Sequence, residues 1–242
     1  MRMKTKLPPR MRNFHYWIHC SKTVFRREIA VLRKIIDERL LPTFASIEKE
    51  ADAVSDEAWK SYNTDAGPDS DPGMAAEAAH DAGVCHYIAM VDAKQGLLNL
   101  FAVALHHLVE QQQFVVLRQE FDARAPWTLC EFVKRLDASA IKVKKFSSWD
   151  DITELRKVAN TAKHAEGKSA EWLRNHRPEI FTPTCLRAEA QLMQRPNRWL
   201  FQPLSGQDLF VTADDLRRYF RAAESFWLEF EEALTSKAQD AI

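Results

Sequence analysis

The chain has 242 residues with 34 basic and 34 acidic side chains, so its formal net charge at pH 7 is zero. This balance removes the global electrostatic argument for nucleic-acid binding and leaves only local patches. Apolar residues make up 46% of the chain and charged residues 28%, as in a globular protein with a sizeable core. Because glycines number only six and long stretches lack proline, helices are favoured over a turn-rich β protein.

The cysteines and the apolar runs limit the cellular locations that the sequence allows. The four cysteines are far apart and form no Cys-x-x-Cys pair, which argues against a zinc knuckle or a disulfide framework. The apolar run 14–18 is short for a secretory signal, and 96–109 is too short to span a bilayer. We therefore expect a cytoplasmic protein with no membrane partner. No glycine-rich phosphate loop or metalloprotease motif appears, so no cofactor or metal is expected.

The first half of the chain predicts helices separated by one acidic loop. Residues 1–12 are basic and contain two prolines, which predicts a disordered basic arm before a single helical domain, 13–242. Apolar residues recur every three or four positions from about 11 to 41, where Pro42 interrupts the pattern, and a second helix is expected from about 43 to 62. Prolines, glycines and aspartates then predict a loop at about 61–73.

Residues 74–123 predict the longest helix, because they contain no proline. Between Ile88 and Val109 apolar residues surround the helix on nearly all sides, so we expect a central, buried helix. His106 and His107 lie in this stretch and point about 100° apart, which argues against both serving one small site. Glu110, one turn later, is in reach of a histidine or of Arg156.

The segment 148–167 predicts a short helix with its own start and stop signals. Ser148 and Asp151 have the spacing of a capping box, and Gly167 is placed to end the helix. One face should pack on the core through Ile152, Leu155, Val158, Ala159 and Ala162. Arg156, Asn160 and His164 form a separate stripe that runs from the edge of this face towards solvent.

Basic residues cluster in sequence around this helix. Lys144 and Lys145 precede it, and Lys163 and Lys168 lie at its far end. They are the candidate RNA-binding residues, and solvated surface lysines are the alternative. Beyond them, 181–211 reads as an extended segment wrapped on the core, with a short strand at 209–211. Thr212 and Asp215 form a second capping box that opens a last helix, whose aromatic stripe predicts a core face or, in part, a dimer face.

A family resemblance rests on the pattern Leu155-Arg156-x-x-Ala159-Asn160-x-x-Lys163-His164-x-x-Gly167, followed by Ser169-Ala170 and Arg177-Pro178-Glu179-Ile180-Phe181. This stretch, within 148–181, resembles the signature helix of HEPN-like proteins, which include bacterial toxins and abortive-infection RNases. The resemblance implies an all-α, HEPN-like helical bundle with a long central helix, an extended wrapping segment and a C-terminal helix. It also implies that Arg156 and His164, with the polar Asn160 between them, form a catalytic set across a homodimer interface. Seven residues separate Arg156 from His164, whereas the family has about four to six.

Two functions remain open. The first is a metal-independent RNase acting in bacterial stress or phage defence, in which Arg156 binds phosphate and His164 transfers protons. The second is an inactive HEPN-like interaction or regulatory module, such as an antitoxin or another partner-binding protein. In that case Arg156 pairs with Glu110 or Asp151, Asn160 bonds to backbone, and His164 favours the helix C-terminus.

Overall fold

The computed structural model describes residues 10–65, 71–122, 127–190 and 199–239, and the regular secondary structure in these ranges is helical. These ranges contain no β-strand, which confirms the all-α prediction. The helices in chain order are α1 (Phe14–Cys20), α2 (Arg26–Ile35), α3 (Ile47–Asp65), α4 (Pro72–Phe121), α5 (Leu129–Ala138), α6 (Trp149–His164), α7 (Lys168–His176), α8 (Arg187–Ala190) and α9 (Ala213–Gln239).

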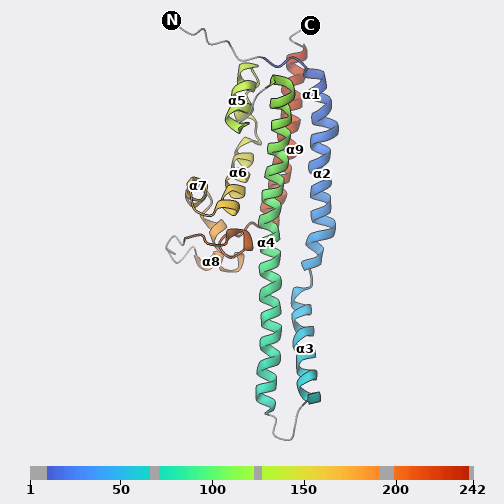
Figure 1. Ribbon diagram of the computed structural model, residues 1–242, viewed down its shortest axis with the longest axis vertical. Coiled ribbons are helices and arrows are strands. Elements are labelled where there is room, and N and C mark those ends of the chain that lie inside the picture. Colours follow the sequence, from blue (N-terminus) through green and yellow to red (C-terminus); the bar gives the residue numbers. More distant parts are fainter. Residues whose placement is uncertain (1–9, 66–70, 123–126, 191–198, 240–242) are drawn as a thin grey trace.

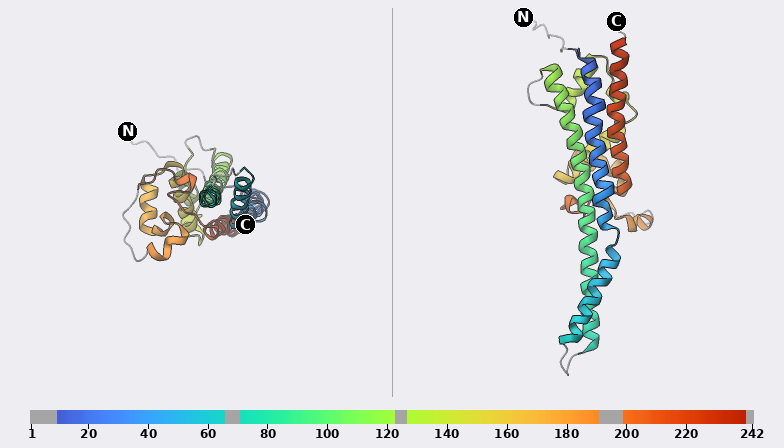
Figure 2. Two further views of the ribbon diagram at one scale, coloured as in Figure 1. Left: turned by 90° about the horizontal axis from the view of Figure 1, so that it is seen from below. Right: turned by 90° about the vertical axis from the view of Figure 1, so that its right-hand side faces the viewer.

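The molecule is built on α4, which has 50 residues and is therefore about 75 Å long. Its C-terminal half lies in a bundle with α1, α2, α6 and α9, and we call this bundle, with the segments packed on it, the head (Figure 1). Its N-terminal half projects from the head with α3 beside it, and we call residues 47–95 the arm. Figure 2 shows the same division from the side: the bundle ends and the two-helix arm continues.

Burial along α4 changes where the head ends. Leu98, Leu105 and Val109 are buried in the head core, whereas Ile88 is 53% exposed and Val91 is 38% exposed. The prediction of a long central helix is confirmed, and the expectation that it is buried from residue 88 onward was wrong. By length and composition alone α4 could cross a membrane, a test that the core helix of a soluble protein also passes.

The N-terminal helical stretch forms one long side of the head. Two π-helical turns, Ser21–Phe25 and Ile36–Leu40, interrupt the α-helical geometry without ending the rod. Trp17, Phe25 and Ile29 are buried, and this stretch packs along α9. Pro42 falls in the 3₁₀ turn Leu41–Phe44 that leads into the arm, so the predicted interruption is confirmed.

Two predicted boundaries shift. The basic arm was expected to cover 1–12; residues 1–9 lie outside the described part, but Met11 is buried and its N–H donates to Ser139 Oγ at 2.9 Å. The acidic loop was expected at about 61–73, yet α3 continues to Asp65 and α4 begins at Pro72. Residues 66–70 lie outside the described part. Asp71 caps α4 by accepting a hydrogen bond from the Gly73 N–H at 2.8 Å.

Of the extended segment expected at 181–211, residues 199–211 wrap on the head, without the strand expected at 209–211. Residues 184–190 are helical instead, as a 3₁₀ turn and α8, and 191–198 lie outside the described part. The Asn99 side chain of α4 holds the wrapped segment: its amide donates to the Pro203 and Leu209 carbonyls, and its oxygen accepts from the Val211 N–H. Phe201 does not pin this segment to the core, because it is 81% exposed. The segment therefore owes its place chiefly to one buried amide and to the buried side chains of Leu209 and Val211.

The last helix confirms its prediction. Thr212 Oγ1 accepts from the Asp215 N–H at 3.0 Å, and Asp215 accepts from the Thr212 N–H at 3.1 Å, so the capping box is reciprocal. The aromatic stripe of α9 is core: Tyr219, Phe220, Phe226, Trp227 and Phe230 are all buried.

Candidate functional site between α4 and α6

The core face of α6 is as the spacing predicted. Its apolar residues are buried against α4 and α9, namely Ile152, Leu155, Val158, Ala159 and Ala162. The polar stripe is also as predicted: Arg156 and Asn160 are half-buried, and His164 is exposed. The helical spacing therefore predicted the order of exposure along this stripe correctly.

Both ends of α6 differ from the prediction. Ser148 does not cap its own helix; its hydroxyl and N–H donate to Glu229 of α9, as do those of Ser147. Burial alone would raise the pKa of Glu229, but these hydrogen bonds lower it. At the other end α6 stops at His164, and Ala165, not Gly167, takes the positive φ of 56° after the last turn.

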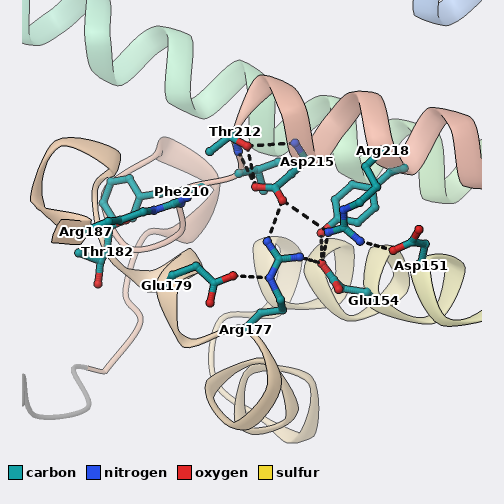
Figure 3. Close-up of polar contacts among 12 residues, drawn as sticks. Asp151, Glu154, Arg177, Glu179, Thr182, Arg187, Phe210, Thr212, Asp215 and Arg218 are labelled. Atoms are coloured by element: carbon teal, nitrogen blue, oxygen red, sulfur yellow. Dashed lines mark hydrogen bonds and ion pairs between the residues drawn. The ribbon is translucent and has the colours of Figure 1, made fainter. Parts of the chain in front are cut away.

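A charged network anchors the middle of α6, and Figure 3 shows its members converging from three segments. Arg177, just after α7, contacts Glu154 of α6, Asp215 of α9 and Glu179. Arg218 of α9 contacts Asp151 and also Glu154. The network fixes α6 against α9 and against the 3₁₀ turn Pro178–Phe181.

The electrostatics of this network indicate a structural role. Glu154 also accepts a hydrogen bond from the Tyr219 hydroxyl at 2.6 Å, and burial together with this carboxylate raises the pKa of Tyr219. Burial would raise the pKa of Asp215, but hydrogen bonds from Arg177 and Thr212 lower it. Since each of these charged groups contacts an opposite charge, the network is accounted for by its role in packing α6 against α9.

A second polar group lies where α6 packs on α4, and we call it the seam cluster: His106, His107, Glu110, Arg156 and Lys163. His107 Nδ1 lies 3.3 Å from Glu110 Oε2, and Lys163 Nζ lies 3.1 Å from His107 Nε2. An ammonium can only donate, so in this contact Nε2 accepts and the imidazole proton is on Nδ1. The Glu110 carboxylate lies beside Nδ1 as an ion-pair partner for a protonated imidazole, without a hydrogen bond between the two side chains in the described residues.

Arg156 supplies an unpaired positive charge to this group. Its Nε is buried without a hydrogen-bond partner, and no ion pair joins it to an acid in the described residues. The expected pairing with Glu110 or Asp151 was wrong, because Glu110 faces His107 and Asp151 faces Arg218. Burial and the neighbouring Arg156 lower the pKa of Lys157. Crowded cations with a buried unpaired donor are the setting in which an anion binds well.

His106 is the buried member of the cluster. Burial, then the neighbouring His107 and the positive charges of Lys163 and Arg156, lower its pKa from 6.5 to about 3. Its Nδ1 has no hydrogen-bond partner among the described residues. It is therefore uncharged at neutral pH and cannot serve there as a general acid.

A metal ion is the other ligand that distance alone would allow. One ligand atom each from His106, His107 and Glu110 lies within 4.8 Å of the others, so the argument that adjacent histidines cannot share a site does not hold on distance. However, Lys163 contacts the free nitrogen of His107, and Arg156 adds a second positive charge nearby. These charges oppose a cation, and we favour an anion as the ligand.

The remaining predicted site residues are only partly brought together. Lys163 joins the seam cluster, and Lys168 is exposed at the start of α7, four residues after His164. Lys144 and Lys145 are exposed before α6 begins, and the 16 residues of α6 put about 24 Å between its ends. Asn160 and His164 make no side-chain hydrogen bond within the described ranges.

His107 was not among the site residues predicted from the sequence. Its spacing to Glu110 was a usable signal, because residues three apart on a helix are neighbours. Its approach to Lys163, 56 positions away, depends on how α4 and α6 pack and has no local signal.

Comparisons of the chain with protein-family models, with curated proteins and with solved structures give no match. The functional argument therefore rests on the residues themselves.

Proposed function

We propose that the chain is a metal-independent ribonuclease of the HEPN type, with the seam cluster as its phosphate site. The observation that carries the proposal is the row Glu110–His107–Lys163 beside Arg156, whose buried Nε has no hydrogen-bond partner in the described part of the chain. An imidazole with a carboxylate on one side and two cations nearby combines a proton acceptor with a site for a negatively charged phosphate. The proposal includes that the protein acts in the cytoplasm, in bacterial stress or phage defence.

Each residue has a role in cleavage by the neighbouring 2′-hydroxyl. His107 Nε2 takes the 2′-hydroxyl proton after the phosphate has drawn Lys163 away, and Glu110 stabilises the resulting imidazolium. Arg156 and Lys163 hold the charge on the phosphorane. His164 gives a proton to the leaving 5′-oxygen, and Asn160 orients the phosphate. The 2′-oxygen–phosphorus bond forms, the phosphorus–5′-oxygen bond breaks, and the products carry a 2′,3′-cyclic phosphate and a 5′-hydroxyl.

A second histidine within one chain means that catalysis does not require a dimer to supply the second proton-transfer group. Pairing two signature helices across a twofold axis was expected because the signature helix holds a single histidine. In this proposal His107 of α4 supplies the second proton-transfer group, so one copy carries the complete set.

The alternative function is an inactive interaction module that binds a cognate antitoxin or a regulator. Its specific support is the exposed apolar surface on the arm, since large exposed apolar patches mark interaction sites. In that case the seam cluster is a structural feature of the head.

The test is cleavage of a mixed RNA pool, with tRNA included, by the purified chain in EDTA. We expect His107→Ala and His164→Ala each to slow cleavage by about a hundredfold or more, the usual worth of a general acid or base. His80→Ala, an exposed histidine on the arm, is the matched control and should cleave normally. Circular dichroism checks that all variants are folded.

The outcomes separate the two functions. Activity that survives in both folded variants would end the proposed roles, and activity that requires a divalent ion would replace the anion site by a metal site. A folded wild-type chain that cleaves no RNA in the pool would favour the interaction module.

A further inference from the structure

An apolar stripe runs along α4 in both the head and the arm. We call it the α4 seam, and it is distinct from the polar seam cluster. It repeats every seven residues, with one series at Val84, Val91, Leu98 and Leu105 and a second at Ile88, Gln95, Ala102 and Val109. A heptad repeat of this kind is the pattern of helices that pack as a coiled coil. In the head the seam is buried: Leu98, Ala102, Leu105 and Val109 are at most 4% exposed.

In the arm the same seam is uncovered. Val84, Tyr87, Ile88 and Val91 are 38–53% exposed. Among the described residues α3 alone accompanies α4 here, and it packs on another side, through Ala75, Ala79 and Gly83 (Figures 1 and 2). The turn Pro203–Ser205 borders the seam: Leu204 is 43% exposed and its carbonyl faces Gly96, one turn beyond Val91. Phe201, three residues earlier, is 81% exposed.

Charge is segregated between the two parts of the molecule. The described residues of the arm, 47–65 and 71–95, hold 10 acidic and three basic side chains, a net charge of −7. The described residues outside the arm hold 25 basic and 22 acidic side chains, a net charge of +3. Two copies with their arms parallel would place like charges together, whereas an antiparallel pair brings each acidic arm towards a basic head.

We propose that the exposed seam of α4 binds a second copy of the chain, with the two α4 helices antiparallel and the two arms forming a four-helix bundle. Each seam then covers the other, as α6 and α9 cover it in the head. A twofold axis between Ile88 and Val91 brings the exposed seams of the two copies together and directs the free end of each arm towards the head of the other copy. Parallel pairing in register would bring the two heads to the same place.

The exposed area suits this partner. Val84, Tyr87, Ile88, Val91, Phe201 and Leu204 expose roughly 500 Å² of apolar surface per copy, from typical side-chain areas and their exposed fractions. A symmetric pair doubles this to about 1,000 Å², the size at which a specific interface begins. The proposal is independent of the ribonuclease proposal, because these residues lie outside the seam cluster.

The test is sedimentation velocity of the full chain over a range of concentrations. We expect a dimer that weakens at high salt, and a dissociation constant raised by about tenfold or more in Ile88→Glu. Val31→Glu on α2 is the matched control, since Val31 is 51% exposed and Ile88 is 53% exposed, and it should dimerise normally. Phe201→Ser is a second test variant and decides the matter if Ile88→Glu does not fold.

Three results would overturn the proposal. The first is a wild-type chain that stays monomeric at every concentration. The second is a dimer that persists unchanged in folded Ile88→Glu and Phe201→Ser, which would place the interface elsewhere. The third is a monomer that co-sediments with phosphatidylcholine vesicles through Ile88, which would assign the seam to a lipid surface.

Discussion

His106 gives the head a specific response to acid. Its imidazole is neutral in the folded chain, where its pKa is about 3, and titrates near 6.5 in the unfolded chain. The unfolded state therefore binds more protons between these values, and stability is lost as the pH falls from 6.5 towards 3. The slope from this one group approaches about 1.4 kcal/mol per pH unit.

Replacement of His106 should remove this slope. We expect the free energy of unfolding of wild type to fall between pH 6.5 and 5 by about 2 kcal/mol more than that of His106→Gln, measured by urea denaturation. In this range the carboxylates whose pKa values are lowered remain ionised, so they contribute little. The exposed His80→Gln is the control, and an equal loss in His106→Gln and wild type would contradict the assignment.

Arg177 is the residue whose loss should cost the most stability among the ion pairs. Arg177→Ala leaves Glu154 and Asp215 partly buried with fewer opposite charges, which typically costs about 3–5 kcal/mol. Arg217 also contacts two acids, Asp37 and Asp214, but is 45% exposed, so Arg217→Ala should cost less than about 1 kcal/mol. Similar melting temperatures for the two variants would refute the difference.

Among the elements, the arm depends on close packing at Gly83. A Cβ there would lie 2.9 Å from the Ala51 carbonyl oxygen and 3.0 Å from Ser55 Cβ. Alanine is the better helix former by about 1 kcal/mol, but the clash at this contact costs roughly 1–3 kcal/mol. We expect Gly83→Ala to loosen α3 from α4 despite the gain in helix propensity.

Hydrogen exchange measured by peptide locates that effect. Peptides from α3 should exchange faster in Gly83→Ala, while peptides from α5, which belongs to the head, should be unchanged. Unchanged exchange in α3 would show that the two arm helices do not rely on this contact.

The elements also show what periodicity can and cannot predict. The apolar spacing in α6, the capping box at Thr212 and the length of α4 follow from local pattern, and all three are found. The capping box at Ser148 failed because Glu229, 81 residues later, takes the serine hydroxyl. The burial of Ile88 failed because periodicity identifies an apolar face but not whether a partner helix reaches it.

At the scale of the molecule, a formal charge of zero conceals an acidic arm and a basic head. The zero net charge excludes attraction of RNA by the overall charge of the protein. The packing of the helices shows where a local group of positive charges lies. Lys163 and Arg156 meet the α4 histidines only because α6 packs on α4, whereas Lys144 and Lys145 lie beyond the other end of α6. The family resemblance identifies the candidate site residues on α6. The candidate site residues on α4 are identified only by the packing of α4 against α6.

The central claim is that the seam cluster holds an RNA phosphate, and the most direct measurement is the salt dependence of RNA binding. We would measure binding of a fluorescently labelled single-stranded RNA by anisotropy, for wild type and for Arg156→Ala with Lys163→Ala. Each phosphate contact contributes about 0.7 to the slope of log affinity against log salt for single strands. The double variant should therefore bind more weakly, with a slope smaller by about 1.4 if each cation contacts one phosphate. Lys22→Ala with Arg39→Ala, two exposed cations on the N-terminal helical stretch, removes the same charge and should leave the slope unchanged. Equal affinity and slope in wild type and in the Arg156 and Lys163 variant would contradict the account.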